Sequence, residues 1–155
     1  MGELSHVDES GAARMVDVSG KAVTARAAVA TGTVRTTPDV VALLRRDGLP
    51  KGDALATARI AGIMAAKKTP ELIPLCHPIA LSGVKVEFEL GESDVVITAT
   101  VRTNDRTGVE MEALTAVAVS GLTLHDMIKA VDPRAVLDGV RVEHKHGGKS
   151  GEWDR

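Results

Sequence analysis

The fold of this chain is decided by residues 84–129, which have the sequence VKVEFELGESDVVITATVRTNDRTGVEMEALTAVAVSGLTLHDMIK. Apolar and polar residues alternate over 84–90 and again over 95–102, and turn-forming residues separate the two runs. This period of two predicts an antiparallel hairpin whose strands each turn one face toward a core. The apolar residues then recur at steps of three and four, which predicts one long helix over 107–129.

Further elements are expected on both sides of this stretch. Residues 22–34 are rich in β-branched types and 139–145 are strand-like, so we predict a strand in each. Helices are predicted over 38–47, where a threonine and a proline start the first turn, and over 54–68, where an aspartate precedes it. The order strand, helices, strand, strand, helix, strand is the split βαβ, ferredoxin-like pattern of the α+β class. It has an antiparallel sheet with helices on one face.

The 155 residues match the length of one domain. We expect 1–20 to be a mobile N-terminal segment, 21–146 to be a single ferredoxin-like catalytic domain, and 147–155 to be a flexible glycine-rich tail. The segment 69–78, TPELIPLCHP, contains three prolines, which predicts an ordered loop instead of a helix. If the open face of the sheet is apolar, self-association is one way to cover it.

Composition excludes several classes of protein. The formal net charge is −2, which argues against a generic binder of polyanions. Phe88 and Trp153 are the only members of the Phe, Trp and Tyr set, so a sheet that stacks RNA bases is disfavoured. Cys76 is the single cysteine and cannot form an internal disulfide. With no long apolar run or signal sequence, we expect a cytoplasmic protein without membrane or nucleic-acid partners.

Ionisable residues mark both ends of the predicted long helix. Asp126 and Lys129 are three residues apart and therefore neighbours on one helical face. If the helix is largely buried, these charges are costly unless they are paired or used, which indicates an active site. Glu110 and Glu112 would lie about 200° apart on a helix, so both can face one pocket only if the helix starts after Glu110. Either they are helix-start carboxylates or one of them binds a polar ring edge, such as that of guanine.

Other candidate residues lie in loops. Cys76 and His77 are adjacent, so their side chains point different ways, which argues against a nucleophile–base pair. The two residues are either structural or groups that bind a ligand. GGKSG at 147–151 lacks the first glycine of a phosphate loop, so it is either a cationic flap over an anion or a disordered tail. His144 and His146 share a strand face but have no carboxylate at metal-site spacing, which favours surface histidines. The lysines are either solvated or converge on a phosphate.

Three long motifs resemble one known family. They are PKGDALATARIAGIMAAKKTPELIPLCHP at 50–78, RTGVEMEALTAVAVSGLTLHDMIKAV at 106–131 and KHGGKSG at 145–151. Together they resemble the molybdenum-cofactor biosynthesis protein C family, the cyclic pyranopterin monophosphate synthases. The resemblance extends from about Leu4 to Gly151. One departure is His125, where the family usually has a tyrosine.

The resemblance implies a reaction and a site. The substrate would be cyclised dihydroguanosine triphosphate (3',8-cyclo-7,8-dihydro-GTP), and the products cyclic pyranopterin monophosphate and pyrophosphate. A hexamer built from dimers would hold the site at a subunit interface. No cofactor is required, although magnesium could accompany the triphosphate. The implied catalytic residues are Asp126, Lys129 and Lys51, and the implied ligand contacts are Leu75, Cys76, His77, Met111 and Glu112, with Lys67, Glu110, Lys145 and Lys149 in the same pocket.

The implied chemistry suits these residue types. Ring opening and closure need proton transfer, which Lys129 could perform with Asp126 to orient it, unless Asp126 itself acts as the acid and base. Lysines near a triphosphate stabilise the leaving pyrophosphate. The rival interpretation is a non-catalytic ferredoxin-like module that senses a nucleotide between subunits, and it leaves the ionisable helix unexplained.

Overall fold

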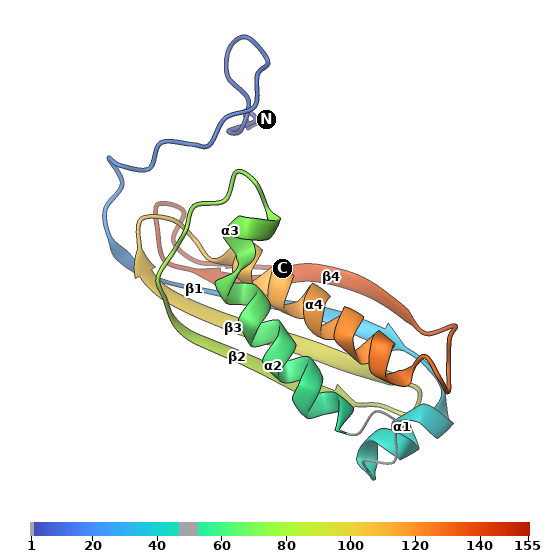
Figure 1. Cartoon of the computed structure of the whole chain (residues 1–155). Helices are drawn as coiled ribbons and strands as arrows, with labels where there is room; N and C mark the ends of the chain where they lie inside the picture. The colour runs from blue at the N-terminus through green and yellow to red at the C-terminus, as the bar shows by residue number, and fades with distance from the viewer. Residues whose placement is uncertain (1, 47–52) are drawn as a thin grey trace.

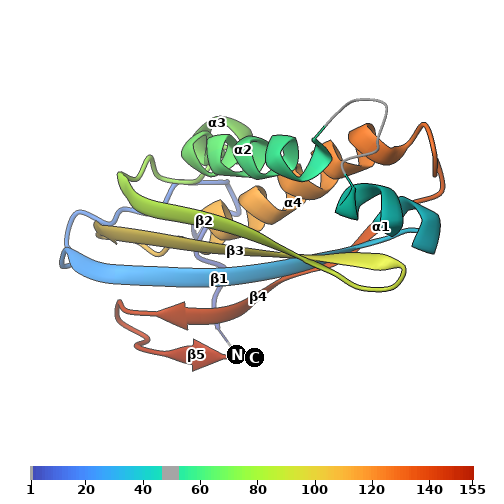
Figure 2. The same ribbon diagram turned by 90° about the horizontal axis from the view of Figure 1, so that it is seen from below.

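The computed structural model describes residues 2–46 and 53–155. A five-stranded antiparallel sheet has the strand order β2-β3-β1-β4-β5, and helices cover one of its faces (Figures 1 and 2). This arrangement confirms the predicted α+β, ferredoxin-like class. The elements are β1 Thr24–Arg35, α1 Pro38–Arg45, α2 Ala54–Lys67, α3 Thr69–Leu72, β2 Leu81–Leu90, β3 Asp94–Asp105, α4 Glu110–Ile128, β4 Val136–His146 and β5 Trp153–Asp154.

The core is aliphatic and built from small side chains. β1 pairs with β3 so that Ala30 faces Ala99, and both are fully buried beneath the helices. From the helical side, α4 contributes Leu124 and Ile128, which are also fully buried. Each such branched side chain stabilises the fold by about 1.5–3 kcal/mol. Because the strands present alanine here, the helices can pack close to the sheet.

α2 and α4 approach each other closely at Gly62. A Cβ atom there would lie 2.1 Å from the Oγ of Ser120 and 2.9 Å from the carbonyl oxygen of Ala116. The Ser120 hydroxyl also donates to the carbonyl of Ala58 at 3.0 Å, so it is held in place. The contact therefore requires a residue without a side chain.

We expect Gly62→Ala to destabilise the protein by about 2–3 kcal/mol, because the added methyl group must push the two helices apart. Thermal or urea unfolding measures this loss. Gly83→Ala is the matched control, because a Cβ at Gly83 meets no atom within 4 Å. Equal stability of the Gly62 variant and wild type would contradict the close packing.

Several element boundaries differ from the sequence prediction. The 69–78 segment was expected to lack helix, but it begins with α3, because Pro70 occupies the first turn, where its missing N–H is not needed. The long helix starts at Glu110 instead of residue 107, and β4 starts at Val136 instead of 139. Within the tail, Trp153 of β5 pairs with Lys145 of β4.

Exposed apolar side chains lie on the helices and also at the β4–β5 edge of the sheet, where Val136 and Trp153 are exposed. The open face carries Thr98 and Thr100, which stand opposite Glu87 and Lys85 of β2. The outer helical surface instead exposes Ile60, Met64, Leu72 and Leu122, each by at least half of its surface. The helices therefore carry an exposed apolar surface of the kind that self-association can cover. None of the helices among the described residues is long and apolar enough to cross a membrane.

Candidate active site

The loop after α3 meets the beginning of α4 at a pocket with a volume of about 190 Å³. α2 and α4 run antiparallel (Figure 1), so the chain leaving α2 reaches the first turn of α4. One wall consists of 75–77 and Ile79, and the other of 107–108 and 110–112. The structure thus brings together six predicted site residues, namely Leu75, Cys76, His77, Glu110, Met111 and Glu112.

Glu112 is the most deeply placed ionisable group of this pocket. It is only 3% exposed, and burial raises its pKa to about 7, with a further contribution from the charge of Glu110. A group with this pKa exists in both protonation states near neutral pH, which suits proton transfer. Burial, followed by the charge of Glu112, also raises the pKa of Cys76, so the thiol stays protonated and is no ready nucleophile.

Glu110 and Glu112 both line the pocket, although α4 has already begun at Glu110. The expectation that they could not share a pocket in this case was wrong. Glu110 is in the first turn and its carboxylate folds back over Gly108, where an added Cβ would lie 2.3 Å from Oε2. Lys145 of β4 holds it there through an ion pair of 2.8 Å between Nζ and Oε1.

Asp126 and Lys129 lie at the other end of α4. Their Oδ1 and Nζ atoms are 2.8 Å apart, which confirms the predicted neighbouring pair, and both side chains are about half exposed. Fourteen residues separate Asp126 from Glu112, which corresponds to about 21 Å along the helix axis. The pocket and the predicted acid/base pair therefore cannot contact one reacting centre within a single copy of the chain.

The remaining predicted lysines are spread around the molecule. Lys67, at the end of α2, lines a separate hollow of about 320 Å³ beside β2. Lys149 is exposed in the turn that precedes β5. Lys51 lies outside the described residues. Among the predicted lysines that the structure describes, Lys145 is the one with an ion pair to a residue of the pocket.

Two residues of this region were missed by the sequence analysis. Arg26 of β1 is 8% exposed and pairs with backbone carbonyls, including that of Asp105 at 3.1 Å, and with no carboxylate of the described residues. The tail passes so closely that a Cβ at Gly148 would lie 2.1 Å from its Nη1 atom. Arg26 lies two residues before Ala28, so a strand places both side chains on the same face. That position in the sequence was the signal that Arg26 is buried. His6 also lines the pocket, and no sequence signal indicated it.

His144 has carboxylate neighbours that its sequence spacing did not indicate. Its Nδ1 lies 2.6 Å from Asp154 and its Nε2 lies 3.8 Å from Glu152, because the pairing of β5 with β4 returns the tail to this strand. His144, Glu152 and Asp154 each bring one possible ligand atom to within 4.8 Å of the others, a spacing that could hold a metal ion and that exposed acidic groups also adopt without one. His146 is exposed at the end of β4, on the same face.

The pocket has the features of a small-molecule enzyme site, because a buried carboxyl group with a raised pKa lies among several polar side chains. The sequence profile of the MoaC family matches residues 15–148. The chain therefore belongs to the MoaC family, and as a member it is a lyase of molybdenum cofactor biosynthesis. This confirms the resemblance seen in the sequence.

Individual relatives are similar along almost their whole length. A cyclic pyranopterin monophosphate synthase 2 of Mycobacterium bovis is 67% identical over 154 residues, covering 99% of this chain and 92% of its own. A cyclic pyranopterin monophosphate synthase of Streptomyces coelicolor is 68% identical over 152 residues, covering 98% and 89%. One of Corynebacterium efficiens is 61% identical over 153 residues, covering 99% of each chain.

Proposed function

We propose that this chain converts cyclised dihydroguanosine triphosphate to cyclic pyranopterin monophosphate and pyrophosphate. The observation that supports this most directly is Glu112, a buried carboxyl group with a pKa of about 7 in a pocket beside Cys76 and Met111. Such a group can accept N–H bonds from a guanine-derived ring when ionised and return a proton when neutral. Relatives that carry the corresponding name match 98% or more of this chain.

The pocket has room for only part of such a ligand. Its volume of about 190 Å³ is below the roughly 300–1,000 Å³ typical of sites for whole small molecules. The ring system would occupy the pocket, and the triphosphate would extend toward the basic residues at its rim. Lys145, which is paired with Glu110, and the buried Arg26 are two cations at this end. We include Lys149 and Lys67 in the proposed phosphate contacts.

The acid/base residues would come from a second copy of the chain. The exposed face of α4 and its C-cap carries, in chain order, Met111, Leu122, Asp126 and Lys129. Met111 and Lys129 are 18 residues apart, which is five full helical turns, so they lie on one face. If two copies pack α4 antiparallel about a two-fold axis near Val119, the pocket of each faces Asp126 and Lys129 of the other. This geometry supports a site between subunits and a dimer as the unit of a hexamer.

In such a site Asp126 and Lys129 would exchange protons with the opening and closing rings. A hydroxyl derived from the ribose attacks the α-phosphate, the bond to the β-phosphate oxygen breaks, and pyrophosphate leaves. The basic side chains, with Lys51 among them, stabilise the charge that develops on the phosphates. The proposal includes no bound cofactor. Magnesium could arrive with the triphosphate.

The apolar surface of α2 and α4 is the proposed contact between copies. It includes a groove of about 390 Å³ lined by Met64, Leu72 and Val119, with Lys68 and Glu71 at its rim. Opposite charges on one patch can pair across a two-fold axis.

We expect Leu122→Glu to shift the assembly to smaller species in size-exclusion chromatography with light scattering, because it buries a charge at the contact. Glu89→Lys on the sheet is the control, and an unchanged mass of the Leu122 variant contradicts this contact.

The test of the proposed function is direct. The purified protein is incubated with cyclised dihydroguanosine triphosphate, and pyrophosphate and the pterin product are both quantified. Stoichiometric formation of both products supports the proposal. Binding without any product from the folded protein supports the rival interpretation, a nucleotide-sensing module. The same assay with a chelator shows whether magnesium has any part in turnover.

A further inference from the structure

The N-terminal arm, defined here as residues 2–20, supplies a wall of the pocket. It extends from the start of β1 past the end of the sheet and finishes in a loop of its own (Figure 1). His6 in this loop lines the pocket together with Cys76, Glu110 and Glu112. These three residues come from the loop after α3 and from α4, so the arm reaches a site assembled by the body of the protein.

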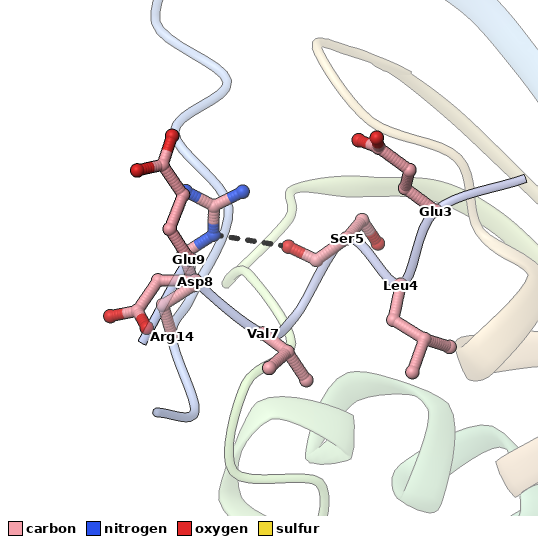
Figure 3. Close-up of a pocket in the computed structure, with 7 residues that line it drawn as sticks. All are labelled: Glu3, Leu4, Ser5, Val7, Asp8, Glu9 and Arg14. Carbon is pink, nitrogen blue, oxygen red and sulfur yellow. Dashed lines mark hydrogen bonds between the residues drawn. The ribbon is translucent and has the colours of Figure 1, made fainter. Parts of the chain in front are cut away.

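The part of the arm that carries His6 has a defined structure. Val7 and Ala13 form an antiparallel bridge, and the N–H of Arg14 donates to the carbonyl of His6 at 2.8 Å. The guanidinium of Arg14 also donates to the carbonyl of Ser5 at 3.2 Å (Figure 3). The backbone on both sides of His6 is thus held by hydrogen bonds, and its position is that of a residue in a hairpin.

The turn of this hairpin is stabilised by Asp8. One carboxylate oxygen accepts bonds from the N–H of Ser10 at 2.9 Å, from its hydroxyl at 2.6 Å and from the N–H of Ala12 at 3.0 Å. Gly11 takes a positive φ of 85° in the same turn, as a tight reversal requires. The sequence therefore builds a specific turn at this place, which a featureless tail would not need.

A second contact ties the arm to the pocket loop. Nε2 of His77 lies 2.5 Å from the carbonyl oxygen of Val16. A carbonyl can only accept, so this nitrogen carries a proton, and in the neutral ring Nδ1 is left as the acceptor. The arm thereby determines which nitrogen of His77 is available to a ligand.

We infer that the arm is part of the ligand site and that His6 makes a polar contact to the ring system bound in the pocket. This inference rests on the proposed function for the identity of the ligand. Among the pocket groups contributed by the body, the carboxyls of Glu110 and Glu112 accept bonds from N–H groups when ionised, and the imidazole of His77 already has Nε2 engaged by Val16. An imidazole adds both a donor and an acceptor, so it can bind a carbonyl or ring nitrogen that carboxylates would repel.

The test compares His6→Phe, which keeps a ring but no polar atoms, with His6→Gln, which restores a donor and an acceptor. We expect His6→Phe to raise both KM and the dissociation constant for cyclised dihydroguanosine triphosphate about tenfold, with kcat changed by less than about twofold. His6→Gln should recover most of the loss. Glu9→Gln in the same hairpin is the control, and it should behave as wild type.

Calorimetric titration with the same compound separates this inference from the proposed function. Unchanged KM and dissociation constant in His6→Phe overturn the role of His6, while turnover by wild type keeps the reaction. Binding by wild type without turnover overturns the reaction but still tests His6 through the dissociation constant. Absence of binding by wild type overturns both. Equal losses in His6→Phe and His6→Gln indicate a structural role and also overturn the polar contact.

Discussion

We expect the variants Asp126→Ala and Glu112→Ala to be nearly inactive as separate proteins. After the two proteins are mixed and exchange subunits, about a quarter of the wild-type activity should return. Alone, each variant should lose roughly 10²–10⁴-fold in kcat, as is usual when a positioned acid or base is removed. The recovery is expected because the proposed composite site takes Glu112 from one copy and Asp126 from the other. In an equal mixture about half of the dimers contain one chain of each variant, and one of their two sites has both native Glu112 and native Asp126. About one site in four is therefore intact.

A second mixture is the matched control. Asp126→Ala and Lys129→Ala remove neighbours on the same end of α4, so no combination of these chains restores a site. Native mass spectrometry verifies that both mixtures contain mixed oligomers. If the first mixture stays inactive although mixed oligomers are present, the two ends of α4 do not act in a shared site between copies. That outcome would also remove the reason for antiparallel packing of α4.

The effect of Glu112→Gln on the free energy of unfolding should be about 3 kcal/mol more favourable at pH 8 than at pH 4.5. The pKa of this carboxyl rises from an ordinary 4.5 to about 7 on folding, because burial disfavours the charged form. The folded state therefore binds the proton more tightly. The contribution of this proton to wild-type stability is therefore fully present below pH 4.5 and is lost as pH rises through 7. Glutamine does not titrate, so the variant lacks this pH dependence.

Urea unfolding of wild type and variant at both pH values measures the difference. Comparing two pH values cancels any constant effect of the amide on packing. Glu89→Gln, on the exposed sheet face, is the control and should show no comparable pH dependence. The same Glu112 variant should be nearly inactive, so stability and activity change in opposite directions. A difference independent of pH would mean that Glu112 is solvated in the folded protein.

The sequence was sufficient for the parts of the fold that depend on periodicity. The hairpin of β2 and β3 and the helix α4 follow from apolar spacing, and the caps at Thr37 and Asp53 located α1 and α2. Helix length could also be read from the sequence, and it already separates Glu112 from Asp126 by about 21 Å. The proposed site shared between copies is one arrangement that reconciles the family resemblance with this helix geometry.

The remaining features depend on tertiary contacts that no local pattern encodes. His6 reaches the pocket through a hairpin of the arm, and Asp154 reaches His144 because the tail returns along β4. Arg26 was overlooked because a charged residue within a strand usually faces solvent, whereas here it is buried beside the tail. Glu110 shares the pocket because the first turn of a helix lets its side chain fold back toward Lys145.

The placement of Trp153 gives this protein an unusual optical property. It is the only tryptophan, the chain has no tyrosine, and it lies on β5 with the guanidinium of Arg155 5.5 Å from its ring centre. Intrinsic fluorescence excited at long wavelength therefore originates in the tail alone and is silent about the aliphatic core. An emission shift would report release of β5 from β4, so a ligand that orders or displaces the tail could be followed without any attached dye.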